Sequence, residues 1–534
     1  MNHGDRPASN PGGTRSPVLA LNGMVATSQP LASAAALRVL QDGGNAVDAS
    51  ITAAAVLNVV EPNSTGIGGD MFALVYMQSE EKPVGLNGSG WAGSKASVDF
   101  FRKRNLTHIP LFGIHSVTVP GAVAGWYKLH ERYGKLPMSR LLMPAIEYSE
   151  KGFPVSDIIS VQWHRAQERL RETPDAARHA LLDGRSPRQG EIFKMPELAR
   201  TLRMLAEGGR DAFYKGEIAK KIVQFSDKSD GMLTLSDFSD FDAQWIEPVS
   251  TNYRGYDVHE LGAQTQGITV LEMLNILEAY DLKAFGHNSA AHLHLMIEAK
   301  KLAFADRDAY IADPGKVNVP EVRLISKEYA AERRRLISQT HAMPSPRPGL
   351  RENGDTVYLT VVDRERNAVS FINSLYEGFG SGLVAGDTGI VLQNRGALFE
   401  LNPAHPNVIA PRKRPFHTLI PGMVLQGGKP VWSFGVMGGD NQPQGHVQAL
   451  INRINFGMDV QQAGEAPRFR HSGEEVLLES AFTESLRSEL VKKGHHIAGA
   501  LDAWGGYQGI AIDSQTGVLM GGSDPRKDGL AIGW

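Results

Sequence analysis

The junction between Asp355 and Thr356 carries the residue of this sequence whose type and surroundings best suit a nucleophile. A loose segment rich in Pro, Arg and Ser, residues 341–353, runs into the junction, and a β-strand pattern begins at Thr356. A threonine hydroxyl is a weak nucleophile unless something activates it. We therefore interpret Thr356 as a nucleophile that becomes useful only after the Asp355–Thr356 peptide bond is cut. We expect the rest of the chain to build a pocket around the new N-terminus.

Arrangements typical of other catalytic classes lack the required spacing. His292 and His294 form one short histidine pair, His495 and His496 form another, and neither has the spacing of a zinc or iron site. The glycine-rich loop 61–70 precedes a strand instead of following one, which favours a tight turn over a phosphate-binding loop, with a role in lining the pocket as the alternative. The sequence has no Gly-x-Ser-x-Gly elbow and no dinucleotide fingerprint. We expect no metal and no cofactor.

Composition is typical of a soluble globular protein. The chain has 534 residues, which on length alone favours two or three domains, and 42% of them are hydrophobic. A formal net charge of −3 offers no basic surface for nucleic acid or an anionic membrane, and no apolar run is long enough to span a bilayer. The absence of cysteine excludes disulfides and a cysteine nucleophile, and is compatible with the cytoplasm. Residues 1–18 have no apolar signal segment and are predicted to form a disordered lead.

The elements that must position Thr356 change character along the chain. Hydrophobic periodicity predicts helices over residues 31–41, 46–60, 139–152, 158–172, 196–207, 215–225, 267–280, 290–312 and 444–456. Strands are predicted over residues 24–28, 71–76, 117–120, 248–260, 357–362, 368–374, 389–392, 422–425, 431–436 and 507–513. The charged residues of 290–312 are expected to form a solvated or ion-paired face. A mostly helical part followed by a strand-rich part suggests stacked layers of helix and sheet.

Motifs in the right order from about residue 19 to the end resemble those of the gamma-glutamyltransferase family of N-terminal-nucleophile hydrolases. They comprise residues 23–26, 43–49, 66–69, 119–121, 301–307, 356–380, 386–394, 413–415, 437–439 and 522–526. The resemblance implies an α/β layered (α+β) fold, a four-layer αββα sandwich, and a precursor that cleaves itself before the threonine. Residues 19–355 would then form a large subunit and residues 356–534 a small one, held together in one αββα unit.

The resemblance also implies roles around the nucleophile. After cleavage, Thr356 would hold both a hydroxyl and a free α-amine, whose reference pKa of about 8 suits a general base at neutral pH. The hydroxyl would attack a substrate carbonyl and form an acyl-enzyme, which water or an amine releases. Ser374 matches the position whose hydroxyl supports the nucleophile, and the backbone N–H groups of Gly438 and Gly439 match the oxyanion hole.

The positions that would bind the donor depart from those of glutathione-cleaving members. Ser89 aligns with an arginine that holds the α-carboxylate of the glutamyl group, and Leu398 aligns with an aspartate that holds its α-amine. His417 and Thr418 align with paired serines, and Tyr376 aligns with an asparagine. Because burying charges without partners costs several kcal/mol each, these residues argue against a γ-glutamyl donor.

Arg395 and His417 stand at positions that match the substrate pocket of the family. An arginine can hold a carboxylate through two hydrogen bonds, although a structural ion pair for Arg395 and a core hydrogen bond for His417 are alternatives. These features resemble a divergent branch of the family that contains oxamate amidohydrolase and some acylase-like proteins. We hypothesise hydrolysis of a small amide whose acyl part carries a carboxylate but no α-amine, with oxamate as the candidate.

Two other functions stay open at this point. One is a gamma-glutamyl hydrolase or transferase that acts on glutathione or other gamma-glutamyl compounds through different contacts. The other is an unprocessed, non-catalytic binding protein that keeps the fold. We also leave open a homodimer of processed units, and we expect neither nucleic acid nor a membrane as a partner.

Overall fold

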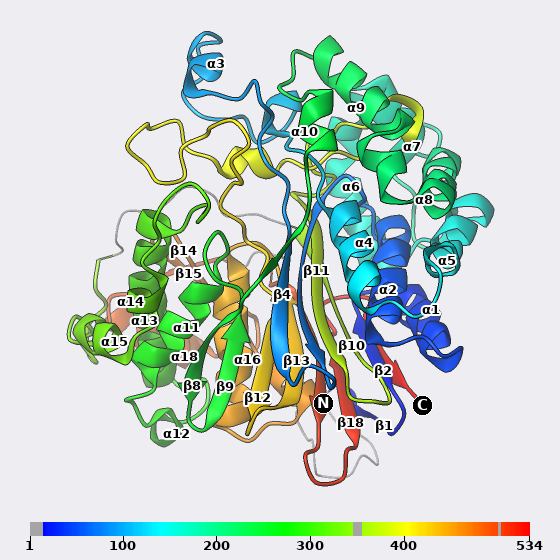
Figure 1. The fold of residues 1–534 in the computed structure, drawn as a ribbon. Coiled ribbons are helices and arrows are strands. Elements are labelled where there is room, and N and C mark those ends of the chain that lie inside the picture. Colours follow the sequence, from blue (N-terminus) through cyan, green and yellow to red (C-terminus); the bar gives the residue numbers. More distant parts are fainter. Residues whose placement is uncertain (1–13, 345–354, 500–503) are drawn as a thin grey trace.

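Two antiparallel sheets packed face to face form the centre of the molecule, and helices cover the outer face of each sheet (Figure 1). The computed structural model describes residues 14–344, 355–499 and 504–534. The first sheet has the order β19 (Leu530–Gly533), β2 (Met24–Thr27), β10 (Asp355–Val362), β11 (Ala368–Tyr376), β3 (Asp70–Met77), β4 (Lys82–Gly88) and β7 (Gln244–Ile246). The second has the order β1 (Val18–Ala20), β18 (Leu519–Ser523), β17 (Gly506–Ile512), β13 (Lys429–Met437), β12 (Gly422–Gln426), β9 (Tyr256–Glu260) and β8 (Val249–Tyr253).

Two sets of helices form the outer layers (Figure 1). The set beside the first sheet comprises α1 (Pro30–Gln41), α2 (Ala46–Val60), α4 (Ala122–Tyr133), α5 (Met138–Lys151), α6 (Asp157–Arg171), α7 (Pro174–Ala180), α8 (Pro196–Tyr214), α9 (Glu217–Lys228) and α10 (Leu235–Ser239). The set beside the second sheet comprises α11 (Gly267–Leu277), α12 (Leu282–Phe285), α13 (Ala290–Tyr310), α14 (Glu321–Leu324), α15 (Lys327–Arg334), α16 (Asn441–Ile454) and α18 (Glu484–Lys492). Smaller elements are α3 (Val98–Arg102), α17 (Val460–Glu465), the pair β5 (Phe153–Pro154) and β6 (Ile192–Phe193), and the sheet of β14 (Phe469–Ser472), β15 (Glu475–Leu478) and β16 (His496–Ala498).

Side-chain alternation along the central strands separates the hydrophobic cores. On β10, Val357 and Leu359 pack with the helices of the first layer, whereas Tyr358 belongs to the core between the two sheets. A third core joins the second sheet to α11, α13 and α16. Successive side chains of a strand point to opposite faces, so one strand can serve two cores. Three stacked cores require four layers, and the predicted αββα sandwich is confirmed.

The two parts of the chain on either side of the Asp355–Thr356 junction interleave in both sheets. β10, which contains the junction at its first residue pair, and β11, which follows it, lie between β2 and β3, which precede it. The strands therefore do not separate into the two or three domains that length alone favours. Residues 1–13 of the predicted lead lie outside the described residues, whereas Thr14 donates two hydrogen bonds to the Glu465 carboxylate.

Two predicted strands are absent from the described part of the chain. Residues 117–120 are extended, but they make single hydrogen bonds to separate loops, such as that from the Val119 N–H to the Trp91 carbonyl. Residues 389–392 form only one isolated bridge, between Val391 and Val384. Both segments carry an apolar pattern because they are buried, and burial without a continuous partner strand does not make a ladder.

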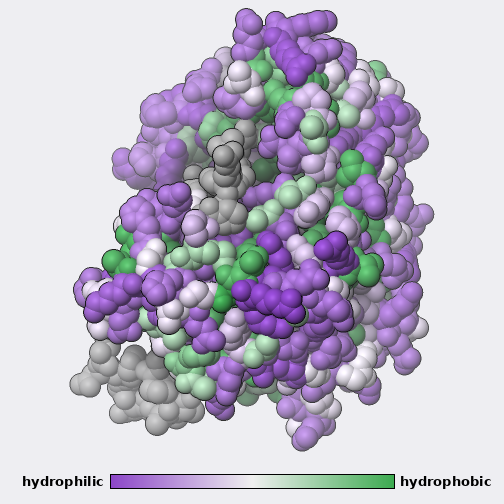
Figure 2. All heavy atoms as spheres, turned by 90° about the vertical axis from the view of Figure 1, so that its left-hand side faces the viewer, coloured by the Kyte–Doolittle hydropathy of each residue, from purple (hydrophilic) through white to green (hydrophobic). Residues whose placement is uncertain are grey.

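The charged face predicted for residues 290–312 is ion-paired but not solvated. Glu298, Lys301 and Arg307 on α13 are all buried, because α18 and β14 pack over this helix. Figure 2 shows the outer surface on this side of the molecule, where hydrophilic residues dominate and hydrophobic residues occur in small groups. Among the described residues, no helix has both the length and the apolar character needed to cross a membrane.

Candidate active site

A β-bulge places Thr356 at the centre of the site. Asp355 pairs with Tyr376 across the β10–β11 ladder, but Val357 already pairs with Asn373, so the register shifts at Thr356. Bulges re-aim side chains and are common beside active sites. The Thr356 hydroxyl donates a hydrogen bond of 3.2 Å to Ser374 Oγ, and both residues are buried. The structure thus brings the predicted nucleophile and its predicted support together.

Ser374 is the point where several contacts converge. Its Oγ accepts hydrogen bonds from Thr356, from the Tyr376 backbone N–H (2.8 Å) and from Arg395 Nη2 (3.1 Å). Tyr376 has a φ of 86°, in the left-handed region that a bulky residue adopts only under strain. Strained residues of this kind cluster at active sites. The turn at Tyr376 aims its N–H back at Ser374 and so fixes the hydroxyl beside Thr356.

Arg395 is fully buried next to this hydroxyl pair. Its Nη1 donates 2.7 Å to Thr418 Oγ1, its Nη2 donates to Ser374, and its guanidinium lies 4.5 Å from the ring centre of Tyr376. Within the described residues, Nε has no hydrogen-bond acceptor and the side chain forms no ion pair. Burial lowers the pKa of Arg395 to about 10, so it remains a cation at neutral pH. A buried cation with a free N–H suits an anionic ligand.

The negative charge of Asp70 stabilises this cation, and the sequence did not single out this residue within loop 61–70. Asp70 pairs with Ser374 in the β3–β11 register, and its Oδ1 accepts from Gln393 Nε2 and from the Gly90 and Gly121 N–H groups. Burial raises the pKa of Asp70 to about 6, although Arg395 opposes the shift. The available signal was an acidic residue at the end of a glycine-rich loop, immediately before a buried strand.

His417 has both ring nitrogens occupied. Nε2 donates 3.1 Å to Asp70 Oδ2, and Nδ1 accepts from the Leu419 N–H at 3.3 Å. Burial, followed by the charge of Arg395, lowers the pKa of His417 well below its usual value, so the ring is neutral. In this position His417 orients Asp70, and the core hydrogen bond considered from the sequence is present.

Gly438 and Gly439 form the turn between β13 and α16. Their φ angles are +118° and +56°, which only glycine adopts freely, and a Cβ on Gly438 would lie 3.0 Å from Gly505 Cα. Neither N–H donates to an acceptor in the described portion of the protein. The N-terminal end of α16, beginning at Asn441, adds a partial positive charge. The turn therefore offers two free donors where negative charge is favoured.

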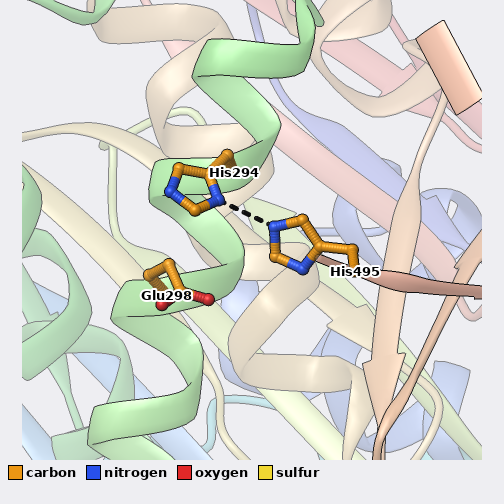
Figure 3. Close-up of side chains that lie close together, drawn as sticks. All are labelled: His294, Glu298 and His495. Carbon is orange, nitrogen blue, oxygen red and sulfur yellow. Dashed lines mark hydrogen bonds between the residues drawn. The ribbon is translucent and has the colours of Figure 1, made fainter. Parts of the chain in front are cut away.

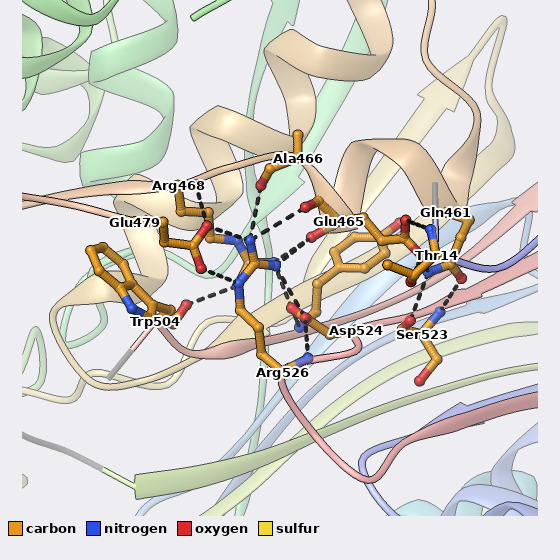
Figure 4. A network of polar contacts seen from close by, with 12 residues as sticks. Thr14, Gln461, Glu465, Ala466, Arg468, Glu479, Trp504, Ser523, Asp524 and Arg526 are labelled. Carbon is orange, nitrogen blue, oxygen red and sulfur yellow. Dashed lines mark hydrogen bonds and ion pairs between the residues drawn. The ribbon is translucent and has the colours of Figure 1, made fainter. Parts of the chain in front are cut away.

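A network of ion pairs and hydrogen bonds around Arg468, Asp524 and Arg526 (Figure 4) connects to this turn. Asp524 accepts from Arg468 Nη2 at 2.7 Å, and Arg468 Nη1 donates to the Trp504 carbonyl at 2.8 Å. That carbonyl also accepts from Asn441 Nδ2, while the Asn441 N–H bonds to the Gly438 carbonyl. The C-terminal motif 522–526 is thus connected to the turn at Gly438 through a chain of hydrogen bonds. The position of the motif in the sequence does not reveal this connection.

Two predicted substrate-binding residues stay outside this hydrogen-bonded set. The Ser89 hydroxyl donates 2.8 Å to Asn87 Oδ1 and accepts from Gln264 Nε2. Leu398 is half-buried at the end of the short 3-10 turn Arg395–Leu398 and presents its carbonyl to Asn407. Neither side chain carries a charge, so neither supplies the arginine or the aspartate that the family resemblance would place at these positions.

Comparison with known proteins decides the family. The sequence model of the gamma-glutamyltranspeptidase family matches residues 32–534. The chain belongs to this family. As a gamma-glutamyltranspeptidase family member it is an N-terminal-nucleophile enzyme that acts on amide bonds. A glutathione hydrolase-like proenzyme of Bacillus subtilis is 40% identical over 97% of this chain and 99% of its own length.

Two further relatives show the range of names within the family. The oxamate amidohydrolase proenzyme of Klebsiella pneumoniae is 36% identical over 96% of this chain and 98% of its own length. The crystal structure of a cephalosporin acylase from Bacillus halodurans superposes with a TM-score of 0.93 at 43% identity and covers 99% of both chains. Two of these three relatives are named proenzymes, that is, precursors that are processed.

In this family member one histidine from each of the two short pairs, His294 and His495, meets the other in the fold (Figure 3). His495 Nε2 lies 2.8 Å from His294 Nδ1, and the ligand atoms of His294, His495 and Glu298 lie within 4.8 Å of one another. Two histidines and a carboxylate are a zinc-type ligand set. However, Glu298 Oε1 accepts from Lys301 Nζ and Oε2 accepts from the Met343 N–H, both at 2.8 Å.

The positive charge in this cluster is therefore the Lys301 ammonium group. Lys301 Nζ also donates 2.8 Å to the Met343 carbonyl, so the pair formed by Glu298 and Lys301 holds both backbone groups of Met343. Met343 lies just before the segment that leads to the Asp355–Thr356 junction. We assign the cluster to anchoring this part of the chain.

Removing one member of the buried pair should destabilise the protein strongly. We expect Glu298→Ala to lower the free energy of unfolding by about 3–5 kcal/mol, because it leaves Lys301 buried and unpaired. The double variant Glu298→Gln, Lys301→Met should lose less. Urea unfolding followed by tryptophan fluorescence measures both, with Glu147→Gln in the exposed pair Glu147–Lys151 as the matched control. A loss from Glu298→Ala as small as that control would contradict the assignment.

Proposed function

We propose that this chain is a proenzyme that cuts itself between Asp355 and Thr356 into residues 1–355 and 356–534. The mature enzyme hydrolyses a small amide whose acyl part carries a carboxylate but no α-amine, as oxamate does. The observation that carries this proposal is Arg395. It is a fully buried cation beside the hydroxyl pair, with no ion pair and a free Nε–H among the described residues.

Hydrolysis proceeds through an ester on Thr356. The free α-amine takes the hydroxyl proton while Oγ1 bonds to the substrate carbonyl carbon, and Ser374 holds the hydroxyl in place. The N–H groups of Gly438 and Gly439 stabilise the oxyanion. The C–N bond then breaks, and the leaving nitrogen takes the proton from the α-ammonium. Water attacks the ester, the amine again accepts a proton, and the acid product leaves as Thr356 regains its hydroxyl hydrogen.

Arg395 gives this reaction its preference for acidic acyl groups. Its Nε–H and the Nη–H groups now directed at Ser374 and Thr418 form a fork that matches a carboxylate. Asp70 is already satisfied by His417, Gln393 and two backbone N–H groups, so it stays beside Arg395 without neutralising it through a direct ion pair. Ser89 and Leu398 leave the pocket without a partner for a substrate α-ammonium group.

A second candidate has support from a different observation. The relative that is 40% identical over nearly its full length is named glutathione hydrolase-like, which favours a γ-glutamyl donor. The relative named oxamate amidohydrolase, at 36% identity, favours the small acidic amide. The charges of the site support the acidic amide. A γ-glutamyl head group would bury an ammonium group for which Ser89 and Leu398 provide no partner.

A matched pair of substrates separates the two candidates. Glutaryl p-nitroanilide and γ-glutamyl p-nitroanilide have the same chain and the same carboxylate, and differ only in the α-amine. We expect kcat/KM to be at least about tenfold higher for the glutaryl compound, since an unpaired buried charge costs more than about 1.4 kcal/mol, and we expect ammonia release from oxamate. Turnover of the γ-glutamyl anilide without turnover of oxamate or the glutaryl anilide would establish the second candidate.

A further inference from the structure

Gln266 joins two parts of the candidate site through a single side-chain amide. It immediately precedes α11, and its Nε2 donates to the Thr418 carbonyl at 2.8 Å and to the Gly439 carbonyl at 2.9 Å. Thr418 is the partner of Arg395, and Gly439 belongs to the turn with the free N–H groups. All these groups are buried except Gly438, which is partly exposed.

Arg307 on α13 fixes which way this amide points. Its Nη1 donates 2.9 Å to Gln266 Oε1 and 2.9 Å to Asp440 Oδ1. An arginine can only donate hydrogen bonds, so the oxygen of Gln266 must face Arg307. The two N–H groups must then face the two carbonyls. The three hydrogen-bond partners therefore set the orientation of the Gln266 amide.

The turn at Gly438 and Gly439 needs such a restraint. Two successive glycines with positive φ have more conformational freedom than any other residue pair, and oxyanion donors act only when they are held in place before the reaction. The Gly439 carbonyl accepts from the Gln442 N–H at 3.1 Å within the same turn. Gln266 ties the Gly439 carbonyl directly to the carbonyl of Thr418, on the opposite side of the site.

We propose that Gln266 is a positioning residue that sets the distance between the oxyanion donors and the Arg395 region, with Arg307 holding its amide in register. The inference rests on the proposed function, because it assigns the Gly438–Gly439 turn to the oxyanion. Gln266 immediately precedes α11 and is remote in sequence from the nucleophile, and the proposal places it among the residues that determine the rate. Gln266 itself does not touch the reacting atoms.

Two variants of the full-length, processed enzyme test the proposal. Gln266→Met removes both donors at similar size, and Gln266→Glu places a carboxylate oxygen against the two carbonyls. We expect kcat to fall about 10- to 100-fold in Gln266→Met, because two hydrogen bonds of ordinary strength are lost, and to fall further in Gln266→Glu. KM should change by less than about threefold, because the groups that bind the acyl carboxylate remain.

The matched control is Gln167→Met, which removes another buried glutamine that bonds to Ser186. Its kcat should stay within about twofold of wild type at temperatures well below unfolding. Ratios of kcat are taken on whichever anilide the wild type turns over, so a wrong choice of substrate leaves the comparison intact. Equal kcat values for Gln266→Met and the control, or a Gln266→Glu variant more active than Gln266→Met, would overturn the proposal.

Discussion

Thr356→Ala is expected to leave the precursor as one uncut chain with no amide hydrolysis. The variant keeps the strand and the bulge but removes the hydroxyl that would attack both its own preceding peptide bond and the substrate. Loss of a covalent nucleophile typically lowers kcat by on the order of 10⁶-fold. A denaturing gel reports the cleavage, and anilide or ammonia release reports the hydrolysis.

Two matched variants sharpen this result. Thr356→Ser keeps a hydroxyl and should still be cut, although more slowly. Thr360→Ala removes another buried threonine hydroxyl of β10, which bonds to Ser433 across the two sheets. It should be cut as fast as wild type. Normal cleavage of Thr356→Ala would mean that another residue is the nucleophile.

Arg395→Met should lose activity selectively on amides whose acyl group carries a carboxylate. The variant loses two charge-assisted hydrogen bonds to the acyl carboxylate. This loss is expected to lower kcat/KM for glutaryl p-nitroanilide by about 10²–10³-fold. Pentanoyl p-nitroanilide has the same chain length without the carboxylate, and its kcat/KM should be unchanged or higher. The informative quantity is the ratio of the two rates in each variant, because it cancels any loss of folded enzyme.

Arg395→Lys is the matched control for this prediction. It keeps the positive charge but loses the planar fork, so its preference for the glutaryl compound should lie between those of wild type and Arg395→Met. An equal loss on both anilides in Arg395→Met would show that Arg395 only supports Ser374. The carboxylate preference would then have to come from elsewhere.

The layered fold was predictable because its central strands have clear patterns. Residues 357–362 and 368–374 alternate between faces that pack on helices and faces that pack on the other sheet, and the buried helix 46–60 has apolar or small residues on most sides. The failures share one cause. Residues 117–120 and 389–392 are as apolar as strands, but only the tertiary structure shows that no continuous partner lies beside them.

The site was predictable only in part, for a related reason. The junction at Thr356 has a local signal, a loose segment that runs into a strand, whereas the pair Gly438–Gly439 was predicted only through the family resemblance. Asp70 and Gln266 acquire their positions from contacts with segments more than 100 residues away, such as those from His417 to Asp70 and from Gln266 to Thr418. The burial of the charges on α13 likewise depends on α18, which a helical pattern cannot reveal.

The central claim is that Thr356 begins a separate chain and carries the acyl group. Intact-mass spectrometry of the purified protein, before and after a brief acid-quenched exposure to glutaryl p-nitroanilide, tests it directly. We predict two polypeptides that divide the 534 residues between Asp355 and Thr356, with the glutaryl mass added only to the one that begins at Thr356. A single full-length chain, or an acyl group on the polypeptide that ends at Asp355, would contradict the claim.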